Sequence, residues 1–174
     1  MTMWVALLRG VNVNGITITS AELKALFESL GYESVRTVLA SGNVVFGADG
    51  RAEEQALKTT IERALGERSG YDAWIVLLPH DDLGAVVDGY PWEETEGAHP
   101  YVVFGSDDDA LAEIEAATAG LDPAVERAVR VGGVVYWECP KGSSTDTPFS
   151  KLLAKARFKA VTTTRNLRTL RKLL

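Results

Sequence analysis

The order of short apolar runs and amphipathic segments constrains the fold of this chain more than any other feature. The run Trp4–Arg9 ends at Gly10, as a buried strand would. Residues 19–30 then place Leu and Phe at helical spacing, and Thr19 with Glu22 three residues later forms a capping box. The chain is therefore predicted to begin with a strand followed by an amphipathic helix.

Two further strands and a second helix complete this first pattern. Residues 33–39 and 44–46 are predicted strands, because the tight turn Ser41-Gly42-Asn43 separates two runs of strand-forming residues. A second amphipathic helix is predicted over 51–66 and a fourth strand over 71–78. The resulting order, βαββαβ, is that of a split βαβ or ferredoxin-like unit.

The pattern starts again after a segment rich in Pro, Gly and Glu at residues 89–100. A strand is predicted at residues 100–105 and a helix at 107–119. A hairpin follows at 126–139 with its turn at Gly132-Gly133, and two helices are predicted at 149–158 and 164–174. A helix thus stands where the last strand of the unit would be. We therefore predict an α+β fold of two tandem ferredoxin-like units, residues 1–88 and 89–174, the second incomplete and closed by C-terminal helices.

Charge is segregated along the chain. Residues 141–174 hold nine Lys or Arg and one acid, a net +8, whereas the whole protein has a net charge of −6. Residues 88–140 hold twelve acids and two Arg, a net −10. Such segregation indicates an electrostatic role for the basic tail, either against the acidic segment inside the fold or towards an anionic partner.

The composition is that of an ordinary globular protein, with 46% hydrophobic and 24% charged residues, and it excludes several classes. The longest apolar run, Ala73–Leu78, is far short of the ~20 residues that span a bilayer, and no secretory leader is recognisable. Cys139 is the only cysteine, which excludes an internal disulfide and a cysteine-rich metal site. We therefore expect a cytoplasmic protein with no membrane segment, no metal and no cofactor.

Three separated motifs carry a resemblance to a known family. They are ALLRGVNV at Ala6–Val13, SGNVVF at Ser41–Phe46, and TTRN at Thr163–Asn166 running into LRKLL at Leu170–Leu174. In this order and at these spacings the chain resembles the domain-of-unknown-function family 1697 (DUF1697), a widespread bacterial family, over essentially its whole length. Ser150-Lys151-Leu152 is similar to a step of the same family. The resemblance implies an α+β fold of ferredoxin-like units and no particular activity.

The sequence departs from that family at two positions. Asn14 stands where the family usually has a second Gly in the first loop, and Leu167 stands where it usually has an aromatic residue after the Arg-Asn pair. The second departure weakens any argument that the tail stacks on a base or ring.

The basic tail is the strongest functional candidate. We expect Thr164 to cap a helix with Arg165 and Asn166 in its first turn, where free N–H groups and the helix dipole favour an anion. The guanidinium of Arg165 would add a bidentate contact. Leu167 and Leu170 give the same helix an apolar stripe, which favours packing on a core. Anion binding and intramolecular docking therefore both stay open.

Arg9 and Asn12 are candidates in the first loop. A charged residue that closes a buried strand is unusual, so Arg9 either contacts a ligand or forms an ion pair between loop and core. Asn12 suits a turn or a ligand contact. In a βαββαβ unit the turn at residues 41–43 lies at the opposite end of the sheet, so the two motifs are not expected to share a pocket.

No complete catalytic constellation is present. His80 and His99 are the only imidazoles, and the sequence has no nucleophile elbow, zinc-protease helix or P-loop. The first hypothesis is a non-enzymatic protein that binds an anion, a nucleotide or nucleic acid through its C-terminal basic segment. Its candidate ligand-binding residues are Arg9, Asn12, Lys151, Arg165 and Asn166. The alternatives are a small-molecule enzyme with a site between the two units, and a protein-interaction module with Trp92 as an exposed anchor.

Overall fold

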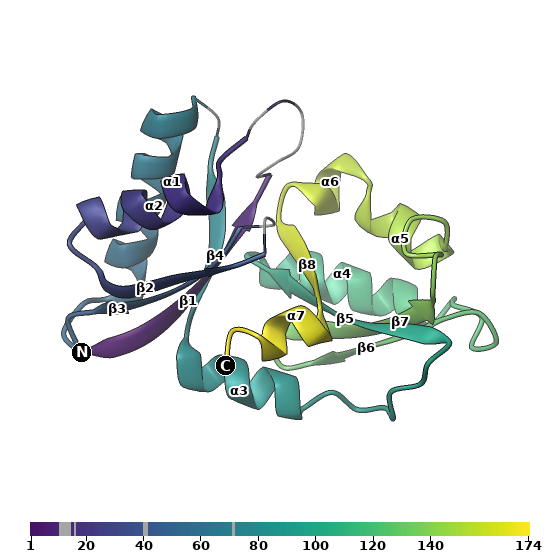
Figure 1. Cartoon of the computed structure of the whole chain (residues 1–174). Coiled ribbons are helices and arrows are strands. Elements are labelled where there is room, and N and C mark those ends of the chain that lie inside the picture. Colours follow the sequence, from purple (N-terminus) through teal and green to yellow (C-terminus); the bar gives the residue numbers. More distant parts are fainter. Residues whose placement is uncertain (11–14, 16, 40–41, 71) are drawn as a thin grey trace. The chain divides into compact units, whose positions relative to one another are not determined.

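The computed structural model describes the chain except for residues 11–14, 16, 40–41 and 71 (Figure 1). The chain divides into two compact units, one of Met1–Ala85 with Arg171–Leu174 and the other of Val86–Leu170. Each unit contains one four-stranded antiparallel sheet with helices. The predicted α+β class is therefore confirmed.

The first unit has the element order expected from the sequence. Its elements are β1 (Thr2–Arg9), α1 (Ser20–Ser29), β2 (Glu33–Val38), β3 (Asn43–Ala48), α2 (Glu54–Ser69) and β4 (Trp74–Pro79). The strand order in the sheet is β2-β3-β1-β4. The predicted capping box starts α1, since the Glu22 amide donates to Thr19 Oγ1 at 3.1 Å and the Thr19 amide donates to Glu22 Oε2 at 2.8 Å.

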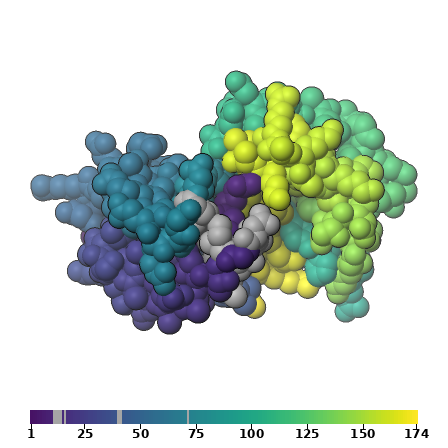
Figure 2. All heavy atoms as spheres, turned by 90° about the horizontal axis from the view of Figure 1, so that it is seen from above, coloured from purple at the N-terminus to yellow at the C-terminus, as the bar shows by residue number. Residues whose placement is uncertain are grey.

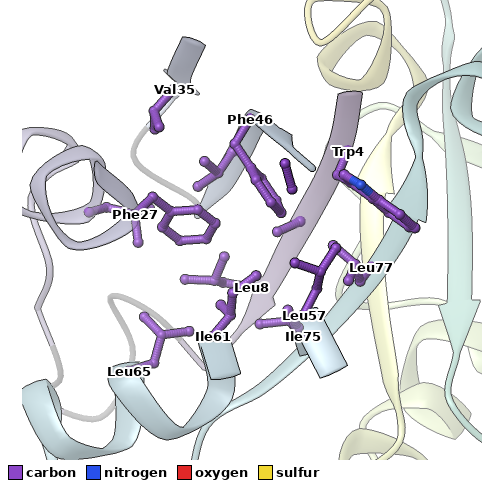
Figure 3. Packing of buried hydrophobic residues seen from close by; sticks show 14 of the residues in the cluster. Trp4, Leu8, Phe27, Val35, Phe46, Leu57, Ile61, Leu65, Ile75 and Leu77 are labelled. Atoms are coloured by element: carbon purple, nitrogen blue, oxygen red, sulfur yellow. The ribbon is translucent and has the colours of Figure 1, made fainter. Parts of the chain in front are cut away.

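The core of this unit lies between one face of the sheet and helices α1 and α2 (Figure 3). Alternate residues of β1 point into it, because successive side chains of a strand face opposite sides. The rings of Phe27 in α1 and Phe46 in β3 meet edge to face with centroids 5.1 Å apart. Helix α2 contributes Leu57, Ile61 and Leu65 at helical spacing.

The last residues of the chain complete the first unit. Arg36 of β2 donates to the carbonyl oxygens of Lys172 at 2.8 Å and Leu173 at 2.9 Å. Nε2 of His80, at the start of α3 (His80–Asp88), lies 3.0 Å from the Leu173 oxygen. The Leu173 side chain is fully buried. This end of the basic tail is thus held through its backbone and one leucine, with the cations at 171 and 172 exposed.

The second unit repeats the strand arrangement of the first. Its elements are β5 (Ala98–Gly105), α4 (Asp108–Thr118), β6 (Arg127–Val131), β7 (Val134–Pro140), α5 (Pro148–Leu153), α6 (Ala156–Lys159), β8 (Thr162–Asn166) and α7 (Leu167–Arg171). The strand order is β6-β7-β5-β8. This is the order of the first sheet, with each strand replaced by its counterpart.

The helix expected over residues 164–174 is wrong, and so is the expectation that the second unit lacks its last strand. Residues 162–166 form strand β8, which pairs antiparallel with β5 from Thr162 opposite Gly105 to Asn166 opposite Tyr101. Three consecutive β-branched Thr residues favour this extended conformation. Helix α7 begins only at Leu167 and has five residues.

The core of the second unit lies on the face of its sheet that carries Tyr101 and Trp137. These two rings stack with centroids 5.0 Å apart, and Phe149 of α5 packs 5.3 Å from Trp137. The carboxylate of Glu126, which is 3% exposed, accepts hydrogen bonds from Trp137 Nε1 at 2.9 Å and from the Phe149 amide at 3.1 Å. Glu126 therefore joins β7 to the start of α5.

Candidate functional site

Arg165 does not lie at the start of a helix, as the sequence suggested, but within strand β8 opposite Val102. Its Nη1 donates to Thr163 Oγ1 at 2.7 Å and to the Thr164 carbonyl oxygen at 3.1 Å. Burial lowers the pKa of the guanidinium to about 10, so the group stays charged at neutral pH. The argument that Arg165 binds an anion from a helix N-terminus therefore no longer applies.

Asn166 points to the other face of the sheet, because it follows Arg165 in the same strand. Its Oδ1 accepts a hydrogen bond from the Arg168 amide at 2.9 Å, which caps the beginning of α7. Its Nδ2 lies 3.5 Å from Nδ1 of His99. The two neighbouring tail residues thus have separate surroundings.

Lys151 is exposed on α5. This helix packs through Phe149 on Trp137, and therefore on the face that carries Tyr101 and Asn166. Arg165 lies on the opposite face. Lys151 and Arg165 therefore do not form one site within the second unit.

The two candidates of the first loop belong to the first unit. The expectation that the turn at residues 41–43 lies at the opposite end of the sheet is wrong, because Asn43 pairs with Leu7 and the Leu8 amide donates to the Gly42 carbonyl oxygen at 2.8 Å, beside the end of β1. Arg9 is the last residue of β1, half-buried and opposite Trp74 of β4. Within the part of the chain that the structure describes, no ion pair joins Arg9 to a carboxylate, so the predicted loop-to-core ion pair is not seen. Asn12 lies outside the described residues.

A groove of about 370 Å³ lies between the C-terminal end of α4 and helix α5. Its lining is mostly apolar and consists of Ala117, Gly120, Leu121, Pro148, Phe149, Lys151, Leu152 and Lys155. The two lysines are the only charged residues of the lining. Helix α5 and the following α6 lie at the surface in the view of Figure 2, in yellow-green. The groove thus combines an apolar floor with two ammonium groups.

Neither lysine is neutralised by a neighbouring acid. Three other cations of the unit are paired, with Arg130 close to Asp108, Arg127 3.1 Å from Glu138, and Arg157 close to Glu113. Over the described residues, Lys151 and Lys155 form no such ion pair. The two ammonium groups therefore give the groove a positive potential that no ion pair of the described residues offsets.

The sequence pointed to Lys151 but not to Lys155. A signal was present, since the two lysines are four residues apart and flank Leu152. Lys155 nevertheless precedes the short helix α6 instead of continuing α5. The groove depends on how α4 packs beside α5, and no local pattern encodes that contact.

A second groove, of about 330 Å³, lies in the first unit and has the opposite character. Its lining residues are Met1, Gly31, Glu33, Gly47, Ala48 and Asp49. The only charged side chains of this lining are acidic. It is therefore not a candidate for the anion that the sequence led us to expect.

Other candidate chemistry finds no support in the geometry. Cys139 is buried, and burial, with smaller contributions from Glu126 and Glu138, raises the pKa of its thiol to about 11, which makes it a poor nucleophile. Trp92 is half-buried, with its ring edge to face with Tyr90 and the Arg127 guanidinium 4.6 Å from its centroid. It is not the free exposed anchor that the sequence suggested.

Among the residues that the structure describes, no cluster of three or more metal-ligating side chains occurs. No helix formed by these residues has both the length and the apolar character of a membrane span.

Comparison with known proteins identifies the family of the chain. A similar solved structure is that of the conserved bacterial protein SP0830 from Streptococcus pneumoniae, at 24% sequence identity and a TM-score of 0.82. The likeness covers 99% of this chain and 96% of that one, and it is a likeness of fold. No curated protein matches the chain. The family model described as "Protein of unknown function (DUF1697)" matches residues 1–136, and the chain belongs to that family.

Proposed function

We propose that the protein is a non-enzymatic binding protein, and that its ligand is an organic anion with an apolar body, such as a nucleotide. The observation that carries the proposal is the groove beside α5, where Lys151 and Lys155 flank an apolar floor. Its size lies within the range of small-molecule pockets. The apolar floor would take the body of the ligand, and the two lysines would take its charge.

Binding is favoured over catalysis because of what lines the groove. Its lining has no carboxylate, imidazole, thiol or hydroxyl that could act as general base or nucleophile. The small-molecule enzyme and the protein-interaction module stay predictions from the sequence. Of the five candidate residues named from the sequence, Lys151 is the one that we keep at the anion site.

We also propose that each unit is ferredoxin-like and that the units correspond to domains at residues 1–88 and 89–174. The strand orders β2-β3-β1-β4 and β6-β7-β5-β8 support the first statement, because both match the βαββαβ arrangement. In such a domain the helices cover one face of the sheet, and the proposed groove lies on that side, at the edge of α5.

A titration with a fluorescent anion tests the binding proposal. The probe is anilinonaphthalene sulfonate, with displacement by AMP as a nucleotide. A unit charge at 4 Å in water contributes about 1 kcal/mol, so removing both lysines costs about 2 kcal/mol. The double variant Lys151→Gln with Lys155→Gln should therefore weaken binding of both compounds about thirtyfold.

Lys159→Gln is the matched control, because this exposed lysine of α6 does not line the groove. It should leave the dissociation constant unchanged. Added salt should weaken binding to the unchanged protein and have less effect on the double variant. Equal affinity of the double variant and the control would overturn the proposal.

A further inference from the structure

Strand β6 is an edge of its sheet, since it pairs only with β7. Val131 and Val134 flank the two-residue turn Gly132-Gly133, and Gly132 has the positive φ of 59° that such a turn needs at its first position. These flanking residues form a hydrogen-bonded pair, and the pairs alternate along the ladder. The N–H and C=O groups of Ala128 and Arg130 therefore point away from the sheet.

The other three edges of the two sheets carry devices that hinder pairing with a further strand. At β4, Glu62 Oε1 accepts from the Ile75 amide at 3.2 Å, and Lys58 Nζ donates to the Ile75 carbonyl at 2.6 Å. At β8, the guanidinium of Arg165 donates to the Thr164 carbonyl at 3.1 Å. At β2, the register shifts between Glu33 and Arg36, which makes the edge irregular.

The edge of β6 has no comparable device. Within the described part of the chain, no side chain is hydrogen-bonded to the outward backbone groups of Ala128 or Arg130. Val129 and Val131 are 38% and 48% exposed, and they belong to the few large apolar residues that remain in water. The strand keeps a regular register with β7 from Arg127 to Val131. A regular edge with open backbone groups and two exposed valines is a template for another strand, in a register that also has to accommodate Arg127 and Arg130.

We propose that β6 pairs antiparallel with β6 of a second copy of the chain, in the register that sets Val129 opposite the partner's Val129. In this register the outward N–H and C=O groups of Ala128 form hydrogen bonds with those of the partner's Arg130. By symmetry, Arg130 pairs in the same way with the partner's Ala128. Each Arg lies opposite an apolar residue, because Arg127 faces the partner's Val131. The two copies would join their sheets into one of eight strands.

The neighbouring symmetric registers are less favourable. A pairing centred on Arg130 would set two guanidinium groups directly opposite each other, which is destabilising. A pairing centred on Ala128 would set Arg130 opposite the partner's Glu126, but this residue is buried and hydrogen-bonded inside its own unit. The five-residue strand is thus complementary to itself in one register. We therefore expect β6 of a second copy to pair with this edge.

The expected complex is weak. One five-residue strand from each copy buries less than the roughly 1,200 Å² of a standard interface, which places the contact in the transient class. Sedimentation over roughly 10 µM to 1 mM should therefore show the average mass rising from 18.8 kDa towards twice that value. A mass that stays at 18.8 kDa over the whole range would overturn the proposal.

Substitution of the central valine tests the register. Val129→Lys sets two ammonium groups opposite each other and should abolish the rise in mass, whereas the control Val125→Lys, at a residue that is 44% exposed outside β6, should keep it. Mixing Val129→Lys with Val129→Glu should restore a dimer containing one copy of each. Persistence of the dimer in Val129→Lys alone, or its absence from the mixture of folded variants, would refute this register.

A disulfide gives a second and independent readout. In a pair without hydrogen bonds the Cα atoms lie about 4.5 Å apart, within the range that a disulfide accepts. Val129→Cys should therefore cross-link two copies on mild oxidation much faster than the control Val125→Cys, and the buried Cys139 should not compete. Equal rates for the two variants would show that β6 does not pair in this register.

Discussion

Replacement of Glu126 should destabilise the second unit more than that of any exposed acid, because its carboxylate is an acceptor for two buried donors. One oxygen accepts from the indole of Trp137 at 2.9 Å and the other from the amide of Phe149 at 3.1 Å, and the residue is 3% exposed. Glu126 thereby connects the loop before β6 with strand β7 and the first turn of α5. Both donor residues are themselves buried.

The size of the effect follows from the two hydrogen bonds. A hydrogen bond to a charged group contributes about 1.5–3 kcal/mol, and a buried donor without a partner costs about 1–3 kcal/mol. Glu126→Gln keeps one acceptor oxygen but sets its NH₂ group against the other donor, so we expect a loss of about 2–4 kcal/mol. Glu126→Ala leaves both donors unpaired and should cost about 2–6 kcal/mol, with the cavity added.

Urea unfolding, followed by tryptophan fluorescence and by circular dichroism, measures the effect. With a slope of about 2 kcal/mol per M, Glu126→Gln should lower the midpoint of the transition that reports on Trp137 by about 1–2 M. Glu96→Gln, an exposed acid of the same unit, should change the free energy of unfolding by less than about 0.5 kcal/mol. If Glu126→Gln were as stable as the unchanged protein, relief of the buried charge would outweigh the lost bond, and the role given to the carboxylate would be wrong.

Two further predictions concern titratable groups. Hydrogen bonds from the Thr19 backbone and then from its side chain, with a further contribution from Arg68, hold the pKa of Glu22 below its ordinary value of 4.5. The ionised Glu22 carboxylate should therefore stabilise the fold above pH 4.5, and this stabilisation should disappear as the pH falls through the lowered pKa. Thermal unfolding should therefore separate Glu22→Gln from the unchanged protein at pH 7 and not at pH ~2; a difference that persists there would contradict this. The thiol of Cys139, with its pKa raised to about 11, should have about one thiolate in a thousand at pH 8 and should react with a disulfide reagent only in denaturant; a native rate equal to the denatured rate would contradict this.

The local sequence predicted the helices and strands of the first unit well, because single side chains mark where these elements begin and end. The capping box at Thr19 and Glu22 starts α1 in the structure, and a continuous run of buried apolar residues marks β1. The tail was predicted less well because two local signals competed. Thr164 is a good helix cap and the following leucines have helical spacing, but pairing with β5 extends the chain up to Asn166. The pairing joins residues about 60 positions apart, and no window around Thr164 contains it.

The candidate site shows the same division between local and distant information. Lys151 could be chosen from its motif, but the groove that it shares with Lys155 also needs Ala117, Gly120 and Leu121 at the C-terminal end of α4, far away in the sequence. Arg165 and Asn166 are adjacent in sequence and were therefore placed together. A strand sends neighbouring side chains to opposite faces. Because residues 162–166 form a strand and not the start of a helix, Arg165 and Asn166 do not form one site.

The exposed charge of the tail supports the proposed binding of an anion. If the charge of the tail served docking on the acidic segment, its cations would lie in ion pairs with acids there. Arg157 lies close to Glu113 of that segment, whereas over the described residues Lys151 and Lys155 form no ion pair. That segment neutralises part of its own charge through Arg127 and Arg130. The end of the tail is held instead by Arg36, which donates to two of its carbonyl oxygens. Eight of the nine cations are exposed, all except Arg165, and two of the eight are the groove lysines Lys151 and Lys155. The end of the tail is thus held through its backbone and a buried leucine, and its exposed cations support the proposed binding of an anion.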